Sequence, residues 1–344
     1  MQVREKQNNL KIDSWIGKYE LQSRVCKINK FGIFSQKWLY DLVSVILIVY
    51  IIFHLFSSGS FAQILLIVNR PWDLKATMIV GIVLLLVPVN WGMEGLKWHE
   101  LLKHQIKISY NQSIQMVLRG VSINFITPWG AGDLIGRLYG LKDAKSRVFA
   151  TGAIGINGLI QMIPTFIFGI SSLLFLTYQF DIDLHTYLII TILFSGISFL
   201  VLLRLKLVQN LWHNFVMKNL YGFVNSCNEI DKSALFRAAG IGFARYLIYS
   251  GQFVLLFILL DVGLNILHIA FGVFWILLSK SIVPKFTELS DLMVRGTAAV
   301  FYFELFDVNE NLVIGATLLI WFNNVVIPGI TGAFLIKKVR YNHD

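Results

Sequence analysis

Charged residues are scarce in this chain, and their scarcity excludes an ordinary soluble domain. They make up 15% of the 344 residues, against 56% hydrophobic residues and 27 phenylalanines. A soluble domain of average composition is about one-quarter charged. The composition therefore predicts an integral membrane protein that crosses the bilayer several times.

Cysteine is nearly absent as well. The two cysteines, Cys26 and Cys227, fall in segments that are predicted below to be cytoplasmic, so neither a disulfide framework nor a thiolate metal site is supported. His99 and His104 do not indicate a zinc site, because they lie five residues apart and a helical HExxH pair lies four apart. We expect no metal and no cofactor.

Recognisable catalytic motifs are also missing. The sequence contains no GxSxG, Walker A, HExxH or dinucleotide-binding motif, and no soluble stretch long enough to form a catalytic domain. We therefore expect no enzyme activity. An integral membrane enzyme that uses Asp133 or Glu94 as a base stays open as an alternative.

Long hydrophobic runs are abundant instead. About 20 apolar residues cross the hydrocarbon core of a bilayer. Candidate runs lie at 38–57, 74–96, 148–177, 186–204, 238–260, 266–284 and 311–336, with a weaker one at 290–306. The predicted fold class is an all-α polytopic membrane protein, with about eight transmembrane helices plus one or two re-entrant segments.

The net charge of +10 follows the membrane topology and does not indicate nucleic acid. The connections predicted to face outward hold only Arg70 and Lys75 of the 30 basic residues. These connections lie near 57–75, 178–185, 261–265 and 305–310. The positive-inside rule then places both termini and the basic segment 1–37 in the cytoplasm of a multi-pass protein of the cell (inner or plasma) membrane.

One polar stretch, NFITPWGAGDLIGR from Asn124 to Arg137, interrupts the apolar pattern. Pro128, Gly130, Gly132 and Gly136 supply a helix break, left-handed backbone and close backbone approach. Basic residues on both sides of the segment predict that it enters and leaves on the cytoplasmic side. Residues 110–136 are therefore predicted to form a re-entrant hairpin whose tip faces a cavity.

A second motif resembles the charged part of this stretch: Asp291 to Arg295 reads DLMVR, and Asp133 to Arg137 reads DLIGR. In each copy the acid and the arginine lie four residues apart, which places them on one helix face as a predicted ion pair. The order of the elements also repeats and indicates an internal duplication. The predicted transmembrane domain spans 38–337, with halves 38–205 and 233–337 and a linker at 206–232.

Ionisable residues inside the membrane are costly and mark functional sites. Arg119, Arg245 and Lys280 have no partner nearby in the sequence and would leave a cavity positively charged, which suits an anionic lipid headgroup. Pairing for structural reasons alone is the alternative. The predicted substrate-binding residues are Arg119, Asn124, Pro128, Gly130, Gly132, Asp133, Arg137, Arg245, Lys280, Asp291 and Arg295.

A second polar group lies at the end of the span at 74–96, in NWGMEGLKWHELLKH from Asn90 to His104. We expect its charged residues and histidines to lie at the inner membrane interface. These are Lys97, His99, Glu100 and His104, together with Glu94, which is expected to be less exposed.

The stretch PWGAGDLIGR resembles the transmembrane family named after lysylphosphatidylglycerol synthase, often described as flippase-like. Pro128, Gly130, Gly132, Asp133 and Arg137 match its motif, NWGMEGLKWHELLK is similar to the end of one of its early spans, and the resemblance covers about 40–336. The family's later glycine-rich element is represented by VPKFTELSDLMVRG, which keeps a proline and an acid but lacks the glycines.

The resemblance implies translocation of a phospholipid or polyprenyl-linked lipid between leaflets, without synthesis of that lipid. The expected partner is therefore a membrane lipid with an anionic headgroup. The alternative is an accessory subunit that does not transport and holds a membrane glycosyltransferase or lipid-modifying enzyme as its partner.

Overall fold

The computed structural model describes residues 73–141, 143–180, 229–283 and 287–338. Every regular element in these ranges is a helix, which confirms the predicted all-α class. Several predicted segments lie outside the described residues, namely 1–37, 38–57, 186–204 and most of the linker 206–232.

Four helices among the described residues are long and apolar enough to cross a membrane. They are α5 (Leu74–Leu102), α8 (Ala144–Phe180), α11 (Lys232–Leu259) and the combined run Glu310–Ile336. Helices of 27 to 37 residues rise about 40 to 55 Å, more than the roughly 30 Å of a hydrocarbon core. These helices confirm the runs predicted at 74–96, 148–177, 238–260 and 311–336.

The last long run is not a uniform helix. It consists of α14 (Glu310–Trp321), a π-helical stretch η3 (Phe322–Val326) and α15 (Ile327–Lys338). π-Helical turns inside α-helices are rare and occur frequently at functional sites. This one brings two buried asparagines, Asn323 and Asn324, into the interior.

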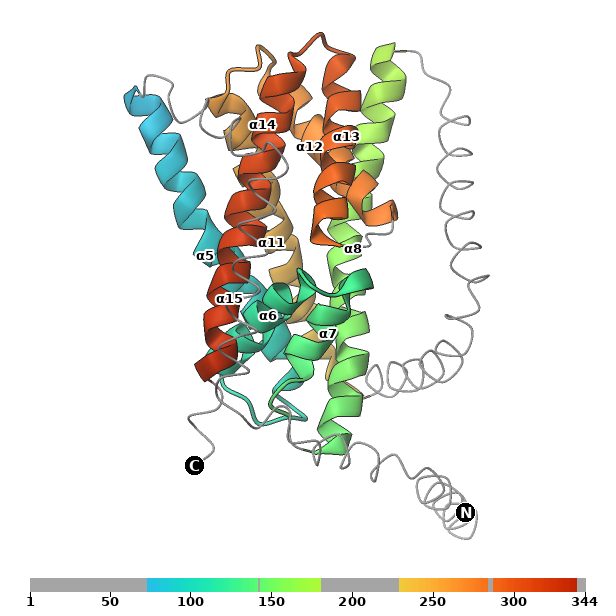
Figure 1. Ribbon diagram of the computed structural model, residues 1–344. Helices are drawn as coiled ribbons and strands as arrows, with labels where there is room; N and C mark the ends of the chain where they lie inside the picture. The colour runs from blue at the N-terminus through green and yellow to red at the C-terminus, as the bar shows by residue number, and fades with distance from the viewer. Residues whose placement is uncertain (1–72, 142, 181–228, 284–286, 339–344) are drawn as a thin grey trace, which may run out of the picture. The chain divides into compact units, whose positions relative to one another are not determined.

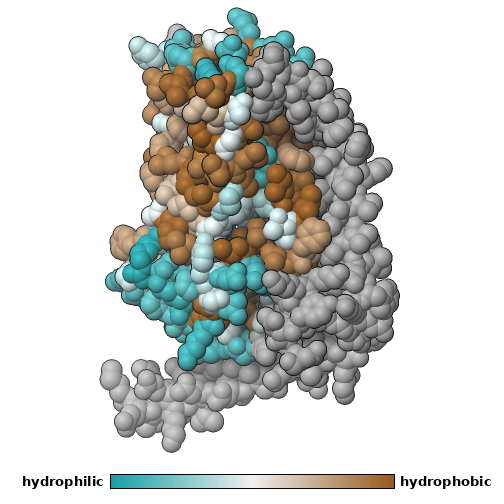
Figure 2. Space-filling model, turned by 90° about the vertical axis from the view of Figure 1, so that its left-hand side faces the viewer, coloured by the Kyte–Doolittle hydropathy of each residue, from teal (hydrophilic) through white to brown (hydrophobic). Residues whose placement is uncertain are grey.

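The outer face of α5 suits contact with lipid. Leu74, Met78, Ile82 and Leu85 are exposed, and their spacing of three or four residues places them on one side of the helix. Figure 2 shows a broad hydrophobic band on this side of the described part, with hydrophilic residues gathered at its upper rim and lower end. The charges inside the apolar runs must therefore be found in the interior.

Residues 110–138 fold into a helical hairpin. α6 (Tyr110–Asn124) begins at a capping box in which Ser109 and Gln112 exchange hydrogen bonds. The turn η2 (Pro128–Gly130) then reverses the chain, and α7 (Ala131–Leu138) returns along α6. Their 15 and 8 residues give lengths of about 22 and 12 Å, so neither arm can cross a membrane. The predicted hairpin is present, and its entry into a bilayer remains a prediction.

The tip of this hairpin uses left-handed backbone. Trp129 has φ 55° and Gly130 has φ 73°, so two consecutive residues occupy a region that glycine enters freely and tryptophan only at a cost. Trp129 is also exposed. Non-glycine residues in this conformation concentrate at functional sites, so the tip is a place to look for function.

Gly132 and Gly136 allow the two arms of the hairpin to touch. A β-carbon on Gly132 would lie 2.3 Å from the backbone nitrogen of Asn124, and one on Gly136 would lie 2.2 Å from that of Gly120. Both distances are impossible without moving backbone. The predicted close approach is therefore a contact between helices, and the turn itself lies at Gly130.

Gly132→Val is expected to destabilise the protein by about 3 kcal/mol, because its side chain would separate the arms of the hairpin. Gly158→Val is the matched control, since Gly158 lies on an exposed face of α8 with no atom within 4 Å of an added β-carbon. The measurement is thermal unfolding followed by size-exclusion chromatography in detergent. Equal stability of the two variants would contradict the observed contact.

A second hairpin is formed by α12 (Ile266–Ile282) and α13 (Glu288–Glu304). Its arms are antiparallel, and the indole nitrogen of Trp275 donates to the carbonyl oxygen of Ala298 at 3.0 Å. The side chain of Thr287 caps the start of α13. The second acid-and-arginine motif therefore begins a helix directly after a chain reversal, as the first one does.

The two hairpins meet tip to tip. α12 and α13 had been predicted as spans at 266–284 and 290–306, yet 17 residues each give a length of only about 25 Å. In Figure 1 they occupy the upper part of the bundle, while α6 and α7 occupy the lower part. Asn124, at the end of α6, donates from Nδ2 to Oε1 of Glu288, at the start of α13, at 2.5 Å.

The buried apolar residues form two clusters. The cluster around Trp98 and Ala153 contains the later part of α5 and the first part of α8. The cluster around Phe257 and Tyr302 contains the later part of α11, α12 and α13. On α11, Arg245 lies between Ala238 of the first cluster and Tyr246 of the second, so this charged residue falls where one cluster gives way to the other.

Candidate functional site

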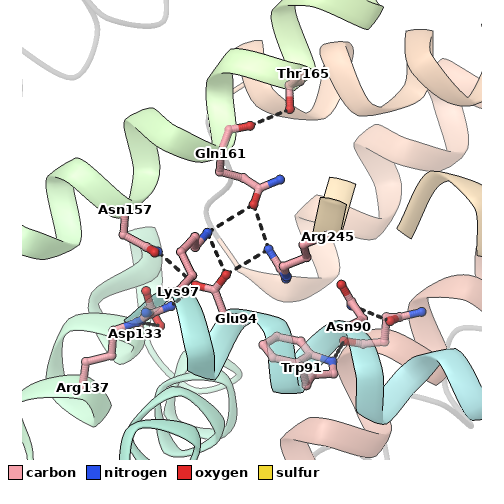
Figure 3. Close-up of polar contacts among 11 residues, drawn as sticks. Asn90, Trp91, Glu94, Lys97, Asp133, Arg137, Asn157, Gln161, Thr165 and Arg245 are labelled. Atoms are coloured by element: carbon pink, nitrogen blue, oxygen red, sulfur yellow. Dashed lines mark hydrogen bonds and ion pairs between the residues drawn. The ribbon is translucent and has the colours of Figure 1, made fainter. Parts of the chain in front are cut away.

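Glu94 is the centre of the buried charges (Figure 3). Its Oε1 accepts hydrogen bonds from Nη2 of Arg137 at 2.9 Å and from Nδ2 of Asn157 at 3.0 Å. Its Oε2 pairs with Nζ of Lys97 at 2.8 Å and with Nη1 of Arg245 at 3.1 Å. One carboxylate thus joins α5, α7, α8 and α11.

Lys97 corrects the prediction that it lies at the membrane interface. Its relative exposure is 0%, and its ammonium group reaches Glu94 and, at 3.3 Å, the side-chain oxygen of Gln161. α11 packs against α5 at this point, and a β-carbon on Gly242 would lie 3.5 Å from Cδ of Lys97, an ordinary van der Waals distance. The sequence pattern gave no sign that α11 covers this side of α5.

The first predicted ion pair is present. Nε of Arg137 donates to Oδ1 of Asp133 at 2.8 Å, and the guanidinium group also lies over the ring of Trp98 at 4.9 Å. Arg137 is buried, whereas the side chain of Asp133 is 33% exposed. Asp133 is therefore the accessible end of a network whose centre is buried.

The second predicted ion pair is present too, one helical turn further along α11. Arg295 pairs with Asp291 at 2.5 Å and donates to the hydroxyl oxygen of Tyr249. Tyr249 lies four residues after Arg245, so α11 places both networks on one face. Nζ of Lys280 lies 3.9 Å from Oδ1 of Asp291.

These two neighbouring networks, together with Glu288, are called the charged belt below. Its members are Glu94, Lys97, Asp133, Arg137, Arg245, Lys280, Glu288, Asp291 and Arg295. The surplus of positive charge lies in the Glu94 network, where the described side chains are three cations (Lys97, Arg137 and Arg245) and two carboxylates (Glu94 and Asp133). Three guanidinium N–H groups also lie buried without an acceptor among the described residues, namely Nη1 of Arg137 and Nε of Arg245 and of Arg295.

Not every predicted binding residue belongs to the belt. The guanidinium group of Arg119 donates to the backbone carbonyl oxygens of Gln115 at 3.0 Å and Tyr139 at 3.3 Å. It thereby holds the end of α7 against α6, away from the hairpin tip. Gly130 and Gly132 shape the backbone beside the belt, and the side chain of Pro128 is not described.

The polar contacts of the π-helical stretch were not predicted from the sequence. Asn324 accepts from Nδ2 of Asn90 at 2.9 Å through its side chain and from the indole of Trp91 at 3.1 Å through its backbone. The guanidinium group of Arg245 lies 5.5 Å from the centre of the Trp91 ring. Two adjacent asparagines in an apolar run were the available signal.

The belt offers paired charges and amides rather than a metal-binding group. Within the described ranges, no group of three or more His, Cys, Asp or Glu side chains could hold a metal ion. The belt's chemistry is that of arginine and lysine held by carboxylates, which suits recognition of an anion.

The family model described as the lysylphosphatidylglycerol synthase TM region matches residues 38–332. This range contains both hairpins and the whole charged belt. No curated protein and no solved structure matches the chain.

Proposed function

The chain belongs to the lysylphosphatidylglycerol synthase transmembrane-region family, and from that premise we propose that it is a flippase-like protein. It binds the headgroup of an anionic phospholipid or polyprenyl-linked lipid in the charged belt and moves this lipid between the leaflets. It does so without covalent chemistry. The observation that carries the proposal is the surplus of basic over acidic side chains in the buried Glu94 network.

The cost of that charge supports a ligand. A single charge in the hydrocarbon region costs at least about 2.5 to 3.5 kcal/mol, and pairing removes that cost only for equal numbers of acids and bases. With every side chain ionised, the Glu94 network has one cation more than carboxylates, and within the described ranges three buried N–H groups of the belt's arginines have no acceptor. Guanidinium groups bind phosphate oxygens through two parallel hydrogen bonds, so a phosphate headgroup would supply both the missing charge and the missing acceptors.

The belt is also accessible in part. The side chains of Asp133, Arg245 and Lys280 are 33%, 17% and 31% exposed. We propose that α6 and α7 enter the membrane and return on the cytoplasmic side, as a re-entrant hairpin that meets α12 and α13 near the midplane. Irregular backbone at that depth is tolerated only inside protein or beside a water-filled cavity.

Native mass spectrometry of the purified protein tests the proposed binding. We expect anionic phospholipid or polyprenyl-linked lipid to remain bound after zwitterionic lipid has been stripped by detergent. A protein that retains neither, but copurifies with a membrane enzyme, would contradict the proposal and support the accessory-subunit alternative.

We further propose that the protein lies in the cell membrane with both termini in the cytoplasm. Glu310→Cys, at the exposed start of α14, is then expected to react with an impermeant maleimide added to intact cells, in a background with Cys26 and Cys227 replaced by serine. Lys232→Cys, at the exposed start of α11, is expected to react only after lysis. The reverse labelling would invert the topology.

A further inference from the structure

Lys97 differs from the other cations of the charged belt in its burial and in its chemistry. Its side chain is 1% exposed, so bulk water does not solvate its ammonium group. The three arginines of the belt keep their protons in any protein environment, whereas a buried lysine can lose its proton. Lys280, the only other lysine of the belt, is 31% exposed. If one cation is neutralised when the belt is empty, Lys97 is the group that can do it.

The groups around Lys97 come from four helices. α5 supplies Glu94, α11 supplies Arg245 and α8 supplies Gln161 and Asn157. α7 supplies Arg137, which shares Glu94 with Lys97 and binds Asp133 in turn. Two arginines therefore compete with Lys97 for one carboxylate. Gln161 accepts from Arg245 as well as from Lys97, so no group here is dedicated to the ammonium ion.

We propose that Lys97 is a proton-binding site linked to occupancy of the charged belt: it is neutral when the belt is empty and takes up one proton when an anionic headgroup binds. The inference rests on the proposed function. Charge counting favours it, because both states are then neutral. In the Glu94 network, the empty site has two cations and two carboxylates, and the occupied site has three cations, two carboxylates and one anion.

The same count identifies the ligand as a monoanion. A phosphodiester carries one negative charge, so a phosphodiester lipid balances the protonated belt, whereas a diphosphate would leave it negative. The proton comes from solvent and binds to Nζ of Lys97, and no covalent bond in the lipid changes. The loaded site is electrically neutral, and a pH difference across the membrane would then bias the direction of transport.

Calorimetric titration with dihexanoyl-phosphatidylglycerol between pH 7 and pH 10, in buffers of different ionisation enthalpy, measures the protons taken up. We expect about one proton per lipid in the alkaline part of this range, with affinity falling about tenfold for each pH unit there. Lys97→Met is expected to bind more weakly and without proton uptake. Lys103→Met is the matched control, since Lys103 pairs with Glu100 outside the belt, and it is expected to behave as the wild type.

The wild type alone decides the result if Lys97→Met does not fold. Binding of phosphatidylglycerol without proton uptake at any pH would overturn the inference and leave the proposed function intact, as would equal uptake by Lys97→Met. No binding at any pH would overturn the proposed function itself. Dimethyl phosphate, a free phosphodiester, separates the two sources of the anion: equal affinity for it would contradict a lipid ligand, and much weaker binding would support one.

Discussion

Glu94→Gln is expected to destabilise the folded protein by about 3 to 5 kcal/mol, the cost of leaving buried charges without their partner. Glu94 contacts Lys97, Arg137 and Arg245. Its loss leaves these three basic side chains with a single carboxylate in their network, that of Asp133, which reaches only Arg137. The measurement is the thermal stability of the purified variant in detergent, together with its yield in the membrane.

Glu100→Gln is the control for this prediction. Glu100 lies on the same helix and also pairs with two cations, Lys103 and Arg237. Lys103 is half-buried and Arg237 is exposed, so solvent can replace the lost partner and we expect a loss of about 1 kcal/mol or less. Similar losses in both variants would show that Glu94 is not the centre of the buried network.

The double variant Asp133→Leu/Arg137→Met is expected to fold yet lose lipid binding by at least about tenfold. The double variant removes one acid and one base, so the net charge of the belt does not change. Replacing a buried ion pair with apolar residues often leaves the free energy of unfolding nearly unchanged. Glu94 keeps Lys97 and Arg245. The single change Asp133→Leu is expected to be less stable than the double variant, because it raises the excess positive charge.

Arg137→Lys tests the geometry of the guanidinium group separately from its charge. One guanidinium group reaches two carboxylates, Asp133 through Nε and Glu94 through Nη2, and an ammonium group cannot reproduce that fork. We expect the variant to keep the charge and fold, but to bind anionic lipid at least about tenfold more weakly. Wild-type binding by Arg137→Lys and by the double variant would leave the DLIGR motif as scaffold only.

Local features of the site followed from the sequence because they depend on spacing and composition. The pairs Asp133–Arg137 and Asp291–Arg295 required only that residues four apart share a helix face, and both pairs are present. The chain reversal before Asp133 followed from its proline and glycines. These constraints act within one or two helical turns.

Long-range partners did not follow, because periodicity does not say which helix faces which. Lys97 was predicted at the interface, since nothing in the sequence of α5 shows that Gln161 of α8 contacts its side chain. Asn124 and Glu288 are 164 residues apart, and their contact depends on two hairpins meeting. Arg119 was assigned to the site on charge alone, whereas its partners are backbone carbonyl groups.

The most direct test of the central claim, that the charged belt carries an anionic lipid across the bilayer, is lipid translocation in proteoliposomes. Fluorescent phosphatidylglycerol and phosphatidylcholine are compared in vesicles that contain the wild type or the Asp133→Leu/Arg137→Met variant. We expect the wild type to move phosphatidylglycerol faster than phosphatidylcholine, and the folded variant to match protein-free vesicles. Wild-type transport of phosphatidylglycerol by that variant would contradict the account.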